Sequence, residues 1–203
     1  MAENRSFFQG AIKIIYLIMK HLSILFCVLF IATNVYSQGD DDSNVLKTSF
    51  GIKAGYNNIQ MKIEDQGRDY VQRDAGIYVG AFVNFPTSET FSVQPEMIYS
   101  SSRYNINDNI DLIHIPVSLK FELANNFTGF IGPEGQFLLG IGDVETDQFN
   151  NFMFGFFFGA NYEVAPHFFI EARPYFALSR LLDNGPGVSR KLNTLQVGLA
   201  YQF

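Results

Sequence analysis

The sequence predicts an all-β fold: an eight-stranded antiparallel up-and-down transmembrane β-barrel, preceded by an N-terminal signal peptide. Three observations lead to this prediction. The C-terminal segment 192–203 alternates apolar and polar residues with the period of two that marks a half-buried strand. Seven earlier segments alternate in the same way, which gives an even number of strands. Long polar connections alternate with short turns, as they do in bacterial outer-membrane barrels.

The C-terminal segment carries the most specific pattern. Val197, Leu199, Tyr201 and Phe203 share one parity, and Phe203 is the final residue. A soluble protein rarely leaves an apolar strand at its terminus, because an unpaired edge invites aggregation. A closed barrel pairs its last strand with its first. We therefore interpret these four residues as a C-terminal barrel-assembly signal, with the last strand of a soluble sandwich as the alternative.

Residues 1–37 are expected to be a secretory signal peptide. A short basic stretch around Lys20 precedes an apolar run at 22–32, and Val35-Tyr36-Ser37 follows as the expected cleavage site. Met19 is an alternative start for this peptide. The competing interpretation is a transmembrane anchor over 12–35, but Lys20 interrupts it, and a charge at mid-bilayer is costly.

The remaining chain divides into a flexible polar leader, 38–47, and the barrel, 48–203. The single cysteine, Cys27, lies in the apolar run of the signal peptide. The mature chain would then have no thiol, which excludes disulfides, cysteine metal sites and cysteine nucleophiles. The formal net charge of −6 argues against nucleic acid as a partner.

The alternation places eight strands along the barrel. They cover 48–63, 75–85, 90–102, 110–123, 127–140, 151–163, 167–179 and 192–203. In the first strand the apolar residues change parity, and a bulge at Asn57-Asn58 would explain this change. Four prolines lie inside these strands, although each lacks the backbone N–H that a strand donates: Pro95, Pro116, Pro133 and Pro174. Bulges at these positions or shifted strand boundaries would account for them.

The charges indicate which face lies inside. A soluble eight-stranded calyx of the lipocalin or streptavidin kind would alternate in the same way with its apolar face inward. The run Phe152, Phe154, Phe156 and Phe158 is too bulky for an eight-stranded lumen but suits acyl chains. The opposite face carries charges of both signs, and we predict that they form a polar network in the lumen. Its members are Lys53, Glu96, Lys120, Glu122, Glu134, Glu171 and Arg173.

A buried charge without a partner is expensive, so the cations of this network are expected to lie beside its carboxylates. We expect Lys120 and Arg173 to neighbour Glu96, Glu122, Glu134 or Glu171. Such networks of paired charges are structural in most proteins, although carboxylates of this kind also serve as general acids and bases.

Several segments resemble a known family. They are SVQPEMIY at 92–99, LIHIPVSLKF at 112–121, GFIGPEGQFLLG at 129–140, FGFFFGANYE at 154–163 and IEAR at 170–173. In their order and spacing they resemble the PorT-like outer-membrane β-barrel family of Bacteroidetes-type bacteria, over residues 48–203. The resemblance implies an eight-stranded barrel that tolerates three of the prolines, Pro95, Pro116 and Pro133, and it implies little about activity. Met153 departs from the family pattern, which leads us to expect an acidic or polar residue there.

The sequence offers little catalytic chemistry, and we expect no enzyme, no cofactor and no metal. The barrel region has two histidines, His114 and His167, and neither has a serine in a nucleophile context. A lipid-modifying barrel enzyme is therefore the weakest alternative. Carboxylates in the connection 143–147 suit Ca²⁺, although a solvated acidic loop is the simpler interpretation.

These observations predict an integral protein of the bacterial outer membrane, with both termini in the periplasm and a narrow polar lumen. Its expected role is structural or in surface interactions; the alternative is a component of outer-membrane protein secretion, by analogy with the family. The expected partners are outer-membrane lipid and lipopolysaccharide, the barrel-assembly machinery, and envelope or secretion proteins.

Overall fold

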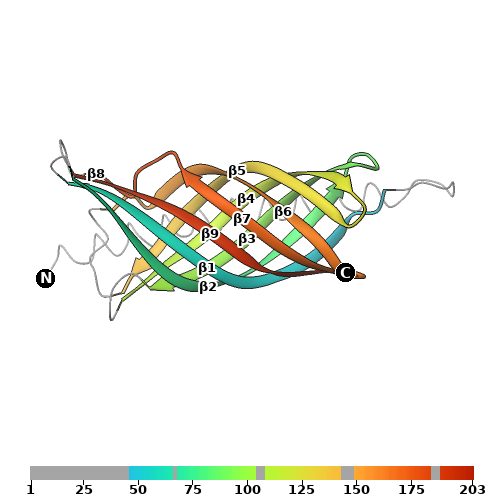
Figure 1. The fold of residues 1–203 in the computed structure, drawn as a ribbon, viewed down its shortest axis with the longest axis horizontal. Helices are drawn as coiled ribbons and strands as arrows, with labels where there is room; N and C mark the ends of the chain where they lie inside the picture. Colours follow the sequence, from blue (N-terminus) through green and yellow to red (C-terminus); the bar gives the residue numbers. More distant parts are fainter. Residues whose placement is uncertain (1–45, 66–67, 104–107, 143–148, 184–187) are drawn as a thin grey trace, which may run out of the picture. The chain divides into compact units, whose positions relative to one another are not determined.

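The computed structural model describes residues 46–65, 68–103, 108–142, 149–183 and 188–203. These residues belong to one compact unit, Leu46–Phe203, which is a barrel (Figure 1). The predicted signal peptide, 1–37, and the leader up to residue 45 lie outside the described residues. Among the residues described there is no helix of the length and apolar character needed to cross a membrane.

Antiparallel strands form the whole wall of the barrel. They are β1 (Ser49–Asp65), β2 (Arg68–Pro86), β3 (Phe91–Arg103), β4 (Asn109–Ala124), β5 (Phe127–Ile141), β6 (Phe152–Ala165), β7 (Phe168–Ala177), β8 (Leu182–Asp183) and β9 (Val188–Gln202). Each long strand pairs with the next, and β1 pairs with β9, from Gly51↔Gln202 to Asp65↔Val188. The two-residue β8 is only a spur on β9. The fold is therefore the predicted closed, eight-stranded, all-antiparallel barrel.

The apolar face of the strands points outward, as the alternation predicts. The four phenylalanines of β6 that share this face are 40–51% exposed, whereas Met153 and Phe157 between them are fully buried. The same outward belt continues on the other strands, for example through Ile131 on β5 and Leu199 on β9. Because bulky side chains occupy the outside, the interior has room for charged and small residues.

The predicted bulge at Asn57-Asn58 is wrong. The pairing of β1 with β2 runs on without a register shift through Asn57↔Gly76, Asn58↔Ala75 and Ile59↔Asp74. Ile59 and Met61 keep the inward parity and are 2% and 3% exposed. The apolar pattern changes parity because the interior itself turns from polar to apolar at this level, while the outer face becomes polar.

The prolines do not mark bulges either. Pro95 pairs with Val117, Pro116 with Glu134, and Pro133 with Phe156, each within its strand register, and so does Pro174 with Leu195. In the described strands the register shifts lie elsewhere, at Asp111/Leu112, Glu122/Ala124 and Glu163/Ala165.

The two ends of the barrel differ. The turn end carries the short connections 87–90, 125–126 and 166–167, and the C-terminus lies there as well (Figure 1). Asn126 and His167 adopt positive φ angles of 66° and 72°, which the tightest turns require. The opposite end, here called the loop end, carries the connections after β1, β3, β5 and β8.

Candidate functional site

A cluster of five buried charges fills the middle of the lumen. Lys53 of β1, Glu96 of β3, Glu134 of β5, and Glu171 and Arg173 of β7 are each 5% exposed or less. They come from every second strand of the wall. Side chains alternate between the two faces of each strand, and these five residues lie on the inner face. Because the barrel is closed, their side chains meet in the lumen.

Arg173 is the centre of this cluster. Its Nη1 lies 2.7 Å from Glu96 Oε2, and its Nη2 lies 3.0 Å from Glu134 Oε2. The guanidinium carbon also lies 4.1 Å from the ring centroid of Phe157, a cation–π contact. The side chain therefore satisfies two carboxylates at once and rests on an apolar ring beneath its plane.

Lys53 completes the charge pairing. Its Nζ lies 2.9 Å from Glu96 Oε2 and 2.8 Å from Glu171 Oε1. Two cations thus face three carboxylates in a space without solvent. An arrangement of this kind holds together only when each charge has partners, because desolvation of an unpaired ion costs several kcal/mol.

Neutral side chains occupy the remaining hydrogen-bonding positions of the carboxylates. Gln94 Nε2 and Ser118 Oγ each donate to Glu96 Oε1 at 2.9 Å. Gln136 Nε2 donates to Glu134 Oε1 at 2.7 Å. The cluster is therefore a connected polar network, which the sequence predicted only through its charged members.

Two predicted members lie outside the cluster. Lys120 Nζ donates to Gln94 Oε1 at 3.1 Å and forms no ion pair with a carboxylate within the described part of the chain. Glu122 is exposed. Both lie near the end of β4, beyond the level of Arg173, so they face the opening of the barrel instead of its middle.

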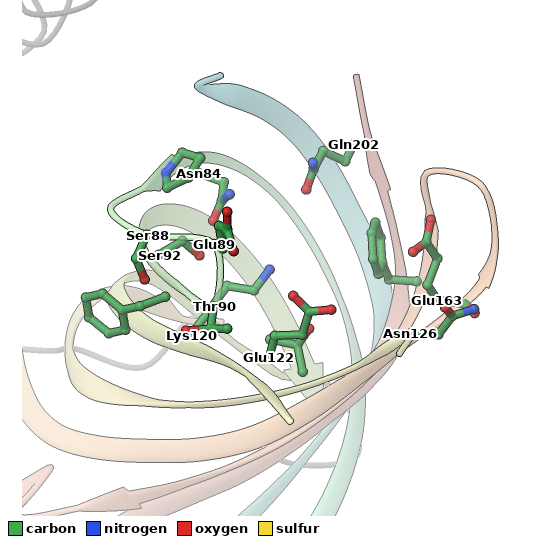
Figure 2. A pocket seen from close by; sticks show the side chains of 14 residues that line it. Asn84, Ser88, Glu89, Thr90, Ser92, Lys120, Glu122, Asn126, Glu163 and Gln202 are labelled. Carbon is green, nitrogen blue, oxygen red and sulfur yellow. The ribbon is translucent and has the colours of Figure 1, made fainter. Parts of the chain in front are cut away.

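These two residues line a hollow at the turn end, with a cavity volume of ≈ 250 Å³. Figure 2 shows Lys120 and Glu122 facing this hollow, with Glu89 and Glu163 on its walls. Three carboxylates against one ammonium make the mouth acidic. Its other lining groups are mostly hydroxyls and amides, so it can accept hydrogen bonds from a polar or cationic partner.

Ser100, His114 and Glu134 form a hydrogen-bonded series that sequence reasoning missed. Ser100 Oγ lies 2.7 Å from His114 Nε2, and His114 Nδ1 lies 2.7 Å from Glu134 Oε1. This is the order of nucleophile, base and acid found in serine hydrolases. Ser100 lies on β3 and His114 on β4, and both side chains point into the lumen. Their positions on the inward faces of two neighbouring strands were the only indication that the sequence offered.

The surroundings of this series do not suit hydrolysis. Ser100 and His114 are both 0% exposed, and none of the three residues lines the hollow at the mouth. Glu134 also binds Arg173 and Gln136, as in a structural network. A substrate would have to reach a serine enclosed by the packed lumen.

An apolar cluster closes the lumen between the charges and the loop end. Its buried members are Ile59, Met61, Ile110, Leu112, Leu138, Ile141, Met153, Leu181 and Leu192. This cluster corrects the prediction of a lumen that is polar throughout. Met153 is fully buried in it, and so the residue that departs from the family pattern has an apolar environment.

The described residues contain no group of three or more histidine, cysteine, aspartate or glutamate side chains placed to hold a metal ion. The acidic connection that suggested Ca²⁺ lies at 143–148, outside those residues, as does Cys27.

The predicted assembly signal lies on the outward face of β9, at the seam with β1. Phe203 stacks on Phe50 with ring centroids 5.0 Å apart, and its N–H donates to the Phe50 carbonyl at 2.8 Å. Tyr201 packs against Phe168 at 4.7 Å, on the other side of β9. The last residues therefore join the two strands that flank β9.

With this geometry established, comparison with known proteins identifies the family. Residues 36–183, more than half of the chain, match the outer membrane protein beta-barrel domain family. The chain belongs to this family. Membership in it, with the barrel fold, points to the bacterial outer membrane. Among curated protein sequences, none matches the chain significantly.

One solved structure supports the barrel fold, and two further outer-membrane proteins are less similar. Neisserial surface protein A is 13% identical, with a TM-score of 0.51, over 77% of this chain and 99% of that one. The attachment invasion locus protein Ail of Yersinia pestis is 12% identical, with a TM-score of 0.47, over 77% of this chain and 97% of that one. OprG of Pseudomonas aeruginosa is 11% identical, with a TM-score of 0.44, over 80% and 99%.

Proposed function

We propose that this protein is a non-catalytic outer-membrane barrel that acts through surfaces at its two ends. The observation that carries the proposal is the filled lumen: the charge cluster and the apolar cluster both occupy the barrel interior with side chains that are 0–8% exposed. A lumen filled in this way suits neither passage of solutes nor a substrate site. The parts that remain open to partners are the loop end and the mouth at the turn end.

The proposed orientation puts the turn end and both ends of the mature chain in the periplasm, with the loop end at the cell surface. Short turns on the periplasmic side and longer connections outside are usual in outer-membrane barrels. The lipid of the outer membrane would then surround the apolar belt. Loop-end residues would meet lipopolysaccharide and other surface molecules.

Single cysteines test this orientation, because Cys27, the only natural cysteine, lies in the predicted signal peptide. Lys62→Cys places a thiol at the loop end, and Asn125→Cys places one at the turn end; both positions are exposed. A membrane-impermeant maleimide applied to intact cells should label only Lys62→Cys. After lysis it should label both. Labelling of only Asn125→Cys in intact cells would reverse the orientation.

A second candidate is a PorT-like role in protein secretion across the outer membrane. The sequence resemblance supports it, and so does the acidic hollow around Lys120, which in the proposed orientation faces the periplasm. Deletion of the gene should then reduce the set of exported proteins in culture supernatants. The charge-reversed mouth Glu89→Lys, Glu122→Lys should reproduce that loss while the barrel still folds. An unchanged secretome in the deletion strain would exclude this role.

The assembly role of Val197, Leu199, Tyr201 and Phe203 is part of the same proposal. It is supported by their position on the outer face of the last strand, where Val197, Leu199 and Phe203 are 42%, 57% and 55% exposed. Nucleic acid is not a partner in this proposal, given the charge of −6.

A further inference from the structure

On the outer wall, the apolar belt ends before the strands do at the loop end. Leu195, 38% exposed, is the outward apolar residue of β9 nearest that end, and Asn58 of β1 lies directly opposite it. Beyond this level the outward residues of β1 include Gln60 and Lys62. β1 stays paired with β2 and with β9 as far as Asp65. These three strands therefore continue past the hydrocarbon region, at the end of the barrel opposite the C-terminus (Figure 1).

Two lysines face each other on this part of the outer wall. Lys62 of β1 lies directly opposite Lys191 of β9 in the strand register. Both side chains lie on the outer face, because the adjacent residues Met61 and Leu192 point into the lumen and are 3% and 0% exposed. Directly opposite residues of an antiparallel pair have Cβ atoms about 4.5–5.5 Å apart, and like charges at this distance repel each other. An anion between the two ammonium groups would turn this repulsion into two attractive contacts.

Arg73 adds a third cation on β2. It lies opposite Gln60 in the pairing of β1 with β2, and it is exposed. Lys62 lies opposite Val71 in the same pairing, so Arg73 is its diagonal neighbour on the outer face. Within the described part of the chain, none of the three cations forms an ion pair with a carboxylate. We call Lys62, Arg73 and Lys191 the basic patch.

The basic patch lies at the level of lipid headgroups. Its arginine is two residues beyond the level of Asn58, and its two lysines are four residues beyond it. At about 3.4 Å per residue, on strands tilted by roughly 40°, these residues lie ~5 and ~10 Å past the end of the belt. The headgroup layer is about 5–8 Å thick on each side of a bilayer, and lysine side chains extend toward it. Glu64 and Asp69 occupy the next register position, farther from the lipid.

Cations are distributed unequally between the two ends of the outer wall. At the turn end, the outward residues of the described strands are apolar, for example Leu123, Val164 and Phe203, which are 64%, 48% and 55% exposed. At the loop end, the exposed Arg103 of β3 continues the basic patch along the wall. This difference fits a membrane in which one leaflet carries a dense negative charge. Lipopolysaccharide supplies such a leaflet, because one molecule carries several phosphate groups.

We propose that the basic patch binds the phosphate groups of lipopolysaccharide, with a phosphate held between Lys62 and Lys191 and with Arg73 on the side nearer the membrane. The acyl chains of the same lipid would lie against the apolar belt below the patch. The inference rests on the proposed orientation, in which the loop end is at the cell surface, and it identifies the lipid that the loop end binds there. Contacts of this kind are charge-assisted and depend on salt.

Three variants and one control test the proposal. Lys62→Gln, Lys191→Gln and the double variant remove the paired charges, and Lys47→Gln removes an exposed lysine that precedes β1 at the turn end. The mature protein is folded into phosphatidylcholine vesicles, without additive, with lipopolysaccharide that has only lipid A and the inner core, or with phosphatidylglycerol at the same density of charge. The quantity measured is the urea concentration at which half of the protein is unfolded.

In phosphatidylcholine alone, the double variant should be at least as stable as the wild type, because the repulsion between the two lysines is gone. Lipopolysaccharide should raise the wild-type midpoint, since a ligand of the folded state stabilises it. The double variant should lose at least half of this rise, each single variant should lose a smaller part, and Lys47→Gln should keep it. Raising the salt concentration should reduce the rise.

Two outcomes would overturn the proposal. A double variant that keeps the full wild-type rise would show that the basic patch does not hold the phosphate. An equal rise with phosphatidylglycerol would show a general attraction to anionic lipid instead of a site for lipopolysaccharide. Vesicles present the added lipid to both ends of the barrel, so the result does not depend on the orientation in cells, which the cysteine labelling tests separately.

Discussion

Arg173 and Glu96 join opposite walls of the barrel. Their Nη1 and Oε2 atoms lie 2.7 Å apart, although three long strands separate β3 from β7 in either direction around the wall. Backbone pairing links each strand only to its neighbours, so this contact is a direct brace across the lumen. It also gives Glu96 a second cation, because the same Oε2 atom already lies 2.9 Å from Lys53 Nζ.

Arg173→Met should therefore destabilise the barrel by about 3–5 kcal/mol, the usual cost of removing one partner from a buried ion pair. The measurement is the urea concentration at which half of the protein in lipid vesicles is unfolded. Folded and unfolded protein are distinguished by the change in electrophoretic mobility that heating causes. Arg103→Met, at an exposed arginine at the end of β3, is the matched control and should change little.

The double variant Glu96→Met, Arg173→Met should recover part of this loss. Lys53 and Glu171 remain paired at 2.8 Å in it, and two buried carboxylates, Glu134 and Glu171, then face Lys53 instead of three. A double variant as unstable as the sum of its two single variants would show that the brace across the lumen contributes no coupling.

Met153→Asp should lower stability, although the family resemblance favours a polar residue at this position. Met153 is fully buried in an apolar cluster, and its cross-strand neighbour Gln136 already donates to Glu134, so a carboxylate there would lose its solvation. We expect a loss of roughly 2–5 kcal/mol. Met153→Leu, which keeps the volume, should cost less than about 1.5 kcal/mol. An aspartate variant as stable as the leucine variant would mean that polar groups or water reach this cluster.

Alternation was enough to predict the strand number and the outward face, because both depend on period two along a single strand. The phenylalanines of β6 show this most clearly, since their parity alone determines that they face outward. The long connection predicted between 63 and 75 is wrong, since β1 runs to Asp65 and β2 begins at Arg68. The change of the interior at Ile59 could not be predicted in this way. It depends on the level at which each strand leaves the membrane, and that level follows from pairing between strands.

The charge cluster was predictable in kind but not in membership. Lys120 and Glu122 alternate on β4 as Glu96 does on β3, yet they lie nearer the mouth. The tilt and stagger of the strands decide which residues reach the same level along the barrel axis. The contact of His114 with Ser100 also needs the register of β3 against β4. Neutral partners such as Gln94 carry no charge that would single them out in a sequence.

The Ser100–His114–Glu134 series should have no hydrolase activity. Ser100 is fully buried and Glu134 is held by Arg173, so a fluorophosphonate probe should leave the folded protein unlabelled. The unfolded protein, whose serine has lost its histidine partner, should also stay unlabelled. Labelling of the folded barrel that Ser100→Ala abolishes would instead establish a nucleophile.

Phe203→Ala should slow assembly more than it lowers stability. Phe203 stacks on Phe50 with centroids 5.0 Å apart, and one such aromatic pair contributes only about 0.5–1.5 kcal/mol beyond its burial. If the terminal residues are read by the barrel-assembly machinery, the folded fraction in cells should fall several-fold. Phe127→Ala, at another outward phenylalanine of the turn end, is the matched control. An equal fall in folded protein for both variants would reduce Phe203 to a packing residue of the seam.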